Sequence, residues 1–341
     1  MKKPRLFYLD LVRAVALGCI LVIHFNASVT GYFAYPSKLF GSILPGNIYL
    51  GDFGSSLFFI VSGAALFYTA KTPFSCAAFF KKRAAAVYPM FWLAWLIWFP
   101  IRFLSQPGSF GSAKGATLLL TAAGLDNFAV AGGWVSQDFA CVGEWFLGSI
   151  LFLYLFFPLL KKGLEKHPAL TWAAALAVCL PVNYFGWDGH LVAIHLLEFL
   201  FGMTFVGFIG AHRWGMAAVL VWPAMALLVK VLPLEGKTVC AVVSAAVFMA
   251  LAGAAGFLSC PATRFVCQKL TKYAYAIFLV HHVLILQMVQ GFDLSVITRR
   301  DTVLLFGVYL VVVMAAAWGL FRLEGILRRR FAALRQELRR A

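Results

Sequence analysis

Long apolar segments, separated by short stretches that hold most of the charged residues, repeat along the whole chain. A transmembrane helix needs about 20 mostly apolar residues to cross a hydrocarbon core of ~30 Å. Segments of roughly that length lie at 8–28, 48–70, 84–104, 143–160, 169–187, 190–210, 214–232, 238–258, 273–291 and 302–321. The pattern therefore predicts an all-α, polytopic transmembrane bundle of about ten spans. The seventh and eighth are the weakest, because Pro223 and Lys230 interrupt the apolar run there.

The composition points to the same class of protein. Of 341 residues, 62% are hydrophobic and 12% are charged, and the mean hydropathy is +0.88. These values exclude a water-soluble domain, so we expect one integral membrane domain over residues 1–341. Its first span is interpreted as uncleaved, because it is long and holds ionisable groups. Seven scattered cysteines lack paired spacing, so neither a disulfide framework nor a metal site is predicted.

The net charge of +16 is distributed by position rather than evenly. With the N-terminus in the cytoplasm, Lys and Arg are about three times as frequent in the cytoplasmic pieces as in the outer pieces. We therefore expect both termini in the cytoplasm, and the bacterial cytoplasmic (inner) membrane as the location. Membrane lipid, and not nucleic acid, is the partner that such a basic excess predicts here. The longest piece between spans, 105–142, is expected on the outer side, where it would be either a flexible loop or, as the favoured alternative, a lid.

The first span carries three ionisable residues, Asp10, Arg13 and His24. Eleven residues separate Arg13 from His24, which at 100° per residue is about 20° past three full turns, so both side chains share one helix face. Their separation along the axis is about 16 Å. Asp10 lies at i−3 from Arg13 and can pair with it. Each charge costs at least ~2.5–3.5 kcal/mol inside a bilayer, so such groups normally face a partner or a polar cavity.

Further polar residues interrupt the later spans. They are Ser62 in the second span, Lys82 and Arg83 at the start of the third, His195 and Glu198 in the sixth, and Tyr275, His281 and His282 in the ninth. Each has a structural interpretation: an interfacial ion pair, a packed core histidine or positive-inside bias. Several imidazoles and carboxylates in one bundle favour function instead.

Taken in order, the motifs resemble those of the integral membrane acyltransferases of family 3. The matching pieces are Arg-x(10)-His from Arg13 to His24, FFIVSG (58–63), FFKKRAAAVYP (79–89), WFLGSILFLYLFFP (145–158), KYAYAIFLVHH (272–282) and RLEGILRRRF (322–331). The resemblance extends from about residue 5 to residue 331. One departure is Ala86, where the family commonly has a second Arg.

The resemblance implies transfer of an acyl group, by default acetyl, from cytoplasmic acyl-CoA to a hydroxyl of an envelope sugar, lipid-linked glycan or polysaccharide. Arg83, with Lys81 or Lys82, would then hold the donor phosphates, and Arg13 and Asp10 would contribute to the same site. The thioester would pass along the first helix to His24. Imidazole suits a general base because its unperturbed pKa is near 6.5.

Other roles follow from the same interpretation. His281 would act as a proton partner or an oxyanion donor, and Ser62 and Tyr275 would line the channel. An acyl-imidazole intermediate on His24 stays open. The alternative function is a transporter or flippase for a lipid-linked or sugar substrate, because buried ionisable groups serve proton-coupled carriers equally well. A third alternative, haem ligation by His24 and His281, lacks paired histidines on one helix.

Overall fold

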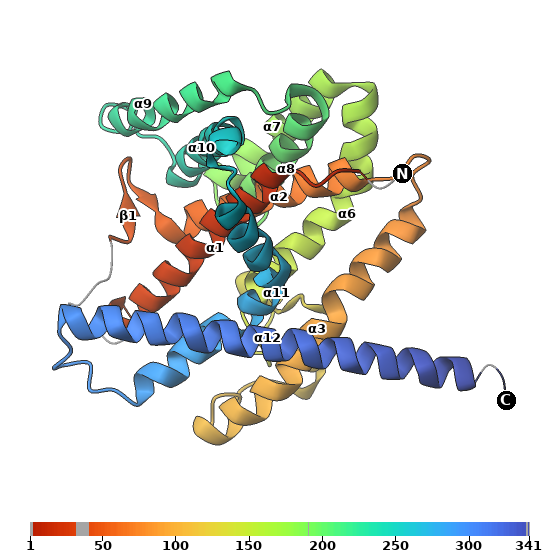
Figure 1. Cartoon of the computed structure of the whole chain (residues 1–341), viewed down its shortest axis with the longest axis vertical. Coiled ribbons are helices and arrows are strands. Elements are labelled where there is room, and N and C mark those ends of the chain that lie inside the picture. The colour runs from red at the N-terminus through yellow and green to blue at the C-terminus, as the bar shows by residue number, and fades with distance from the viewer. Residues whose placement is uncertain (1–2, 32–40, 190, 339, 341) are drawn as a thin grey trace.

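The computed structural model describes residues 3–31, 41–189, 191–338 and 340, and helices make up most of it (Figure 1). The α-helices are α1 Phe7–Asn26, α2 Leu50–Thr69, α3 Cys76–Ser105, α4 Leu118–Ala123, α5 Asp126–Ala131, α6 Glu144–Lys166, α7 Pro168–Tyr184, α8 Ala193–Thr204, α9 Val221–Leu228, α10 Gly236–Leu258, α11 Pro261–Gln290 and α12 Arg299–Glu337. Strands β1 Ile43–Leu44 and β2 Ile48–Tyr49 pair antiparallel before α2.

Shorter turns of other helix types extend or connect these elements. The π-helices are η1 Ala27–Gly31 and η3 Phe205–Ile209, and the 3-10 helices are η2 Gly115–Thr117 and η4 Arg213–Leu220. η1 continues α1, so the first span reaches Val29. η4 leads directly into α9.

The expected all-α membrane fold is confirmed at the level of helices. Among the described residues, seven helices are long and apolar enough to cross a membrane: α1, α2, α3, α6, α10, α11 and α12. The other expected segments form shorter apolar helices, Pro168–Tyr184, Ala193–Ile209 and Arg213–Leu228. None of the three is longer than 17 residues, which is less than the ~20 residues of a typical span. Hydropathy alone therefore overestimated the length of these three elements.

Close contact between α2 and α8 depends on two glycines. A Cβ added to Gly63 would lie 2.0 Å from the carbonyl oxygen of Phe199, and one added to Gly202 would lie 1.9 Å from that of Ile60. Small residues let helix backbones approach in membrane proteins. Almost every residue of α8 is buried, so this helix forms part of the centre of the bundle.

The segment between α3 and α6 is fastened to α3 by side chains of that helix. The indole of Trp95 donates to the carbonyl of Phe139 at 2.8 Å, and Arg102 donates to the carbonyl of Ala140 at 2.9 Å. Nearer the middle of α3, Tyr88 donates to the carbonyl of Ala123 at 3.0 Å. The segment expected to form a lid contains the short helices α4 and α5. These three hydrogen bonds hold it against α3.

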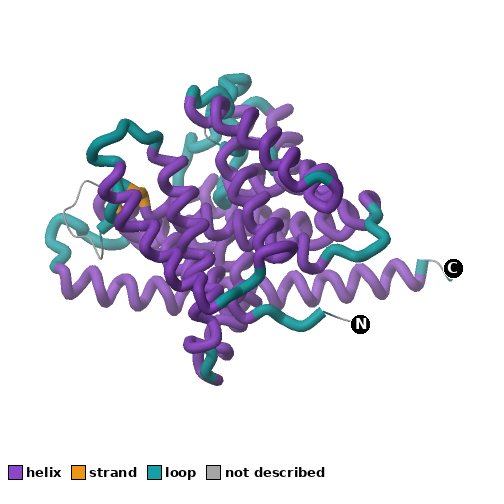
Figure 2. The backbone as a smooth tube through the Cα atoms, turned by 90° about the horizontal axis from the view of Figure 1, so that it is seen from above, coloured by secondary structure: helices purple, strands orange, loops and turns teal. Residues whose placement is uncertain are grey.

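Helix α12 runs along one side of the molecule, and its C-terminal part projects beyond the other helices (Figures 1 and 2). Both views place this end of α12 on the same side as the start of α1. The ends of α1 and α3 and the start of α12 lie on the opposite side in Figure 1. The molecule thus has an N-terminal end, where α1 begins, and a distal end, where α1 finishes.

Candidate active site

Three imidazoles meet near the distal end of α1. The ring of His24 on α1 lies 4.9 Å, between centroids, from the rings of both His281 and His282 on α11. His281 is buried, and His24 and His282 are half-buried. The structure therefore brings together the two histidines that the sequence predicted as catalytic, and adds a third. We call these three residues the histidine cluster.

The orientation of His281 fixes which of its nitrogens carries a proton. Its Nδ1 lies 2.8 Å from the carbonyl oxygen of Phe278 and 3.2 Å from that of Ile277. A carbonyl only accepts hydrogen bonds, so Nδ1 must be the protonated nitrogen. In the neutral ring Nε2 then carries a lone pair, and this atom is buried without a hydrogen-bond partner among the described residues. His281 is therefore arranged as a proton acceptor and not as a neutral hydrogen-bond donor.

The sequence analysis noted His282 in the ninth span but did not predict it as a site residue. Neighbouring residues on a helix point about 100° apart, so a His-His pair suggests that only one ring faces the core. Here His24 contacts both rings. The Nε2 atom of His282, like that of His281, is buried without a partner among the described residues. The sequence signal for His282 was the pair of adjacent histidines, His281 and His282.

Asp10 and Arg13 lie at the N-terminal end and form the expected pair, with 3.7 Å between Arg13 Nη1 and Asp10 Oδ1. Asp10 has a closer partner, because Arg5 donates to its two oxygens at 2.5 and 2.9 Å. This hydrogen bond raises the pKa of Arg5 above its ordinary value. Asp10 is only 2% exposed, so the two guanidinium groups compensate a buried carboxylate.

A cavity of about 700 Å³ opens at this end between the starts of α1 and α11 and the end of α2. Its cationic lining residues are Lys3, Arg5, Arg13, Lys269 and Lys272, and Asp10 is the single carboxylate among the lining residues. The excess of positive charge suits an anionic ligand with several phosphates, which Arg binds as a fork and Lys as a point charge.

Lys82 and Arg83 line a second cavity at the N-terminal end, of about 320 Å³, which also includes Lys71. Thr69 at the end of α2 lines both cavities, so the two are neighbours. Arg83 Nε is buried without a hydrogen-bond partner among the described residues. Lys81 lines neither cavity, so the structure distinguishes it from Lys82.

Tyr154 on α6 connects the two basic sites. The guanidinium carbon of Arg83 lies 6.0 Å from the centre of the Tyr154 ring. Arg13 is also near enough for its charge to act on the Tyr154 hydroxyl. Arg13 and Arg83, which are 70 positions apart in the sequence, thus approach one half-buried tyrosine. The sequence predicted Arg13 and Arg83 at the donor site but did not predict Tyr154 between them.

The other two predicted site residues occupy structural positions near these groups. The Tyr275 hydroxyl donates to the backbone carbonyl of Val87 at 3.1 Å, which joins α11 to α3. Ser62 is half-buried on α2, next to the close contact with α8. Neither residue lines the cavities described here.

The passage expected along α1 is closed by packed side chains. Leu17 and Leu21 lie on α1 between Arg13 and His24, and both belong to the buried core, with 2% and 7% of their surface exposed. Neither basic cavity is lined by a residue of the histidine cluster. The two ends of the predicted site are therefore present, but the open channel between them is not formed by these cavities.

A buried histidine–glutamate hydrogen bond lies on α8. His195 Nδ1 is 2.7 Å from Glu198 Oε2, and the ring of Phe59 stacks on the imidazole with 4.2 Å between centroids. Phe59 belongs to the FFIVSG motif of α2. His195 and Glu198 therefore pack against this motif through Phe59. They are not part of the histidine cluster.

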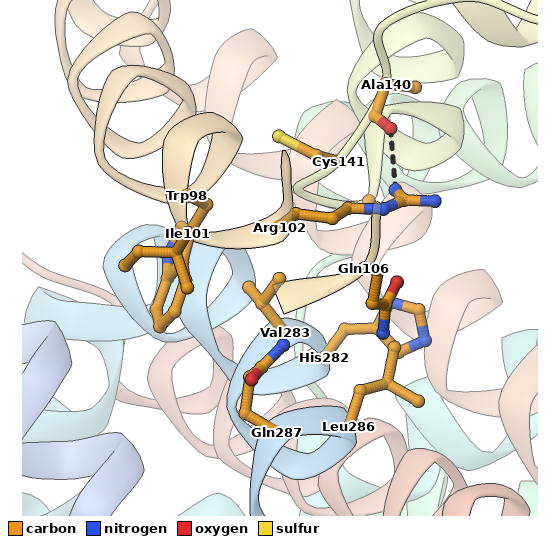
Figure 3. A pocket seen from close by; sticks show the side chains of 11 residues that line it. Trp98, Ile101, Arg102, Gln106, Ala140, Cys141, His282, Val283, Leu286 and Gln287 are labelled. Atoms are coloured by element: carbon orange, nitrogen blue, oxygen red, sulfur yellow. Dashed lines mark hydrogen bonds between the residues drawn. The ribbon is translucent and has the colours of Figure 1, made fainter. Parts of the chain in front are cut away.

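The third cavity, of about 270 Å³, lies at the distal end between the end of α3, the segment before α6, and α11 (Figure 3). His282 lines it, together with Arg102, Gln106 and Gln287. This cavity is the one described here that contacts the histidine cluster.

The contact between His24 and His281 bears on the haem alternative. Among residues 3–31, 41–189, 191–338 and 340, no three His, Cys, Asp or Glu side chains are placed so that they could hold a metal ion. The rings of His24 and His281 meet edge to face at 4.9 Å between centroids. This is direct ring contact, so a haem does not fit between the two rings.

Comparison with known proteins assigns the class. Residues 6–322 match the family described as "Acyltransferase domain", so the chain belongs to acyltransferase family 3. It is also similar to "Acyltransferase MdmB" from Streptomyces mycarofaciens, with 26% identity over 271 residues, which is 69% of this chain and 68% of that protein. No solved structure matches the chain. The resemblance found in the motifs is thus confirmed, and the protein is a membrane acyltransferase by family.

Proposed function

We propose that this protein transfers an acyl group, most simply acetyl, from acyl-CoA to a hydroxyl of an envelope sugar, a lipid-linked glycan or a polysaccharide. The observation that carries the proposal is the meeting of His24, His281 and His282 in a chain of an acyltransferase family, with cationic cavities near the other end of α1. The basic end faces the cytoplasm of a bacterium, and the protein resides in the inner membrane.

The donor binds at the N-terminal end. Its phosphates are held by the cationic cavities, with Arg13 and Arg5 beside one and Lys82 and Arg83 beside the other. About 16 Å along α1 separates Arg13 from His24, a length that an extended pantetheine arm can cover. Donor binding displaces the packed side chains of Leu17 and Leu21. Before it binds, their closure keeps water away from the thioester route.

In the chemical step His24 acts as the general base. The acceptor oxygen attacks the thioester carbonyl while its proton passes to the imidazole, and the C–S bond breaks as the C–O ester bond forms. The imidazolium then returns the proton to the departing thiolate, which leaves as CoA thiol. His281 accepts a hydrogen bond through its free Nε2 and so assists in proton movement. A base of this kind contributes ~10²–10⁴-fold in rate.

A direct experiment tests the reaction. Purified protein in proteoliposomes is given acetyl-CoA, and free thiol is measured with and without an envelope glycan extract from the producing bacterium. We expect acceptor-dependent thiol release and an ester-sized mass increase in the glycan. A transporter or flippase would move glycan across the membrane without consuming thioester, so glycan transport without thiol release would reject the enzyme proposal.

A further inference from the structure

The distal cavity brings together polar groups from two helices and a connecting segment (Figure 3). Arg102 near the end of α3 and Gln287 near the end of α11 both line it, with the ring of Trp98 at one side. Nineteen residues separate Arg102 from Arg83 on the same helix, or about 28 Å along the axis. The cavity therefore lies about one hydrocarbon thickness from the basic end.

We infer that this cavity is the acceptor site, and that it takes one neutral sugar ring of the acceptor. The inference rests on the proposed function. Its volume of about 270 Å³ is at the lower limit of ligand pockets, which span ~300–1,000 Å³. It holds a single ring and excludes a nucleotide-tethered donor. The donor and the acceptor therefore bind at different ends of the molecule.

The lining chemistry matches a polyhydroxyl ligand. The amide of Gln106 offers donors and an acceptor, and Gln287, whose Nε2 donates to Ser105 Oγ at 3.4 Å, keeps its second N–H and its carbonyl oxygen for a ligand. Arg102 uses one N–H on the carbonyl of Ala140, at 2.9 Å, and its other N–H groups remain for a ligand. Trp98 adds a flat apolar surface for the C–H face of a sugar. The lining residues include no carboxylate, so the site does not select a cation.

His282 connects the cavity to the chemistry. It lines the cavity and its ring lies 4.9 Å from that of His24. The Nε2 atoms of His281 and His282 are both buried without a partner among the described residues. Buried polar groups are normally hydrogen-bonded, and a hydroxyl of a ligand in this cavity would supply the missing partner of His282, the member of the cluster that lines it. The acceptor hydroxyl is then placed beside the base.

Gln287 and Gln290 provide a matched test. Gln287 lines the cavity, whereas Gln290, one turn later on α11, is exposed and does not line it. Gln287→Ala and Gln290→Ala are compared with the wild type in proteoliposomes, with labelled acetyl-CoA and increasing amounts of the envelope glycan extract. Loss of one hydrogen bond of ~0.5–1.5 kcal/mol raises the half-saturating acceptor concentration about two- to twelve-fold in Gln287→Ala. Gln290→Ala should match the wild type.

The donor side is measured in the same preparations to show that each variant is folded. The half-saturating acetyl-CoA concentration should be unchanged in both variants. If Gln287→Ala uses the acceptor like the wild type while transfer persists, the cavity is not the acceptor site and the proposed function stands. If wild-type protein transfers no acetyl to the extract, the proposed function fails and the acceptor site fails with it.

Discussion

The backbone of α11 orients the imidazole of His281, since the carbonyls of Phe278 and Ile277 accept hydrogen bonds from its Nδ1–H. A base needs an unprotonated nitrogen, and this arrangement provides one without a neighbouring carboxylate. His24 has a different advantage, because it contacts both other rings. The two residues are therefore unequal, and substitution can separate their roles.

His24→Ala is expected to reduce acetyl transfer by about 10²–10⁴-fold, because the acceptor hydroxyl loses its general base. Binding of CoA, measured by calorimetry on detergent-solubilised protein, should not change, since the cationic cavities lie elsewhere. His167→Ala is the control, because His167 is an exposed histidine between α6 and α7. Full activity in His24→Ala, with loss of activity in His281→Ala, would move the base to His281.

Arg83→Ala is expected to raise the half-saturating concentration of acyl-CoA about ten-fold or more, because a charge-assisted hydrogen bond contributes ~1.5–3 kcal/mol. Turnover at saturating donor should change much less. Lys81→Ala is the matched control, since Lys81 is exposed and lines neither basic cavity. Equal donor dependence in the two variants would reduce Arg83 to a residue that only sets membrane topology.

At this scale, local spacing predicted the pairs that lie on one helix. The i−3 relation of Asp10 to Arg13 is an ion pair in the structure, and the helix from Phe7 to Asn26 is continuous through His24. Contacts between different helices could not be predicted from the sequence. Arg5 was missed as the closer partner of Asp10 because it precedes the helix, and Tyr154 because its motif gave no direction for its side chain.

Among the helices, α10 begins at an acidic cap that also connects it to α7. Glu235 accepts hydrogen bonds from the backbone N–H groups of Lys237 and Thr238 at 2.9 and 2.6 Å, and from Asn183 of α7 at 2.8 Å. Burial raises the pKa of Glu235, but these hydrogen bonds lower it more, so its pKa lies below the usual value. The folded protein therefore prefers the ionised carboxylate.

Glu235→Ala is expected to lower the free energy of unfolding by about 0.5–2 kcal/mol, the usual cost of losing a helix cap. A carboxyl with a lowered pKa stabilises the fold at pH values above its unfolded pKa, and this contribution disappears as the pH falls through the folded pKa. The difference in melting temperature between wild type and variant should therefore be largest near neutral pH and shrink in acid. Exposed Glu337 supplies the control variant, Glu337→Ala. A difference that is constant with pH would contradict this role.

Helix length was the part of each element that hydropathy could not predict. The segments at 190–210 and 214–232 are apolar enough to read as spans, yet each combines a short α-helix with π or 3-10 turns. Apolar residues buried against protein give the same pattern as residues facing lipid. α8 shows the first case, because Gly63 and Gly202 bring it into the bundle.

For the molecule as a whole, the sequence predicted the class and the two ends of the site, and the family match confirmed the class. The open channel is the exception, since Leu17 and Leu21 pack between the ends. Residue spacing shows which side chains share one face of a helix. It does not show which side chains of other helices pack against that face. The distal cavity was missed for the same reason, because its lining comes from α3, α11 and the segment before α6.

Separate cavities at the two ends also determine how products leave. If the two proposed sites are correct, CoA leaves through the cavities lined by Arg13 and Arg83, and the acylated acceptor leaves through the cavity lined by Gln287. Each product therefore competes only with the substrate that binds in the same cavity. Added CoA should raise the apparent Michaelis constant for acyl-CoA without doing so for the acceptor, and added ester should do the reverse. Initial-rate inhibition patterns measure which substrate each product competes with. Competition of CoA with the acceptor would indicate that both substrates enter through one cavity.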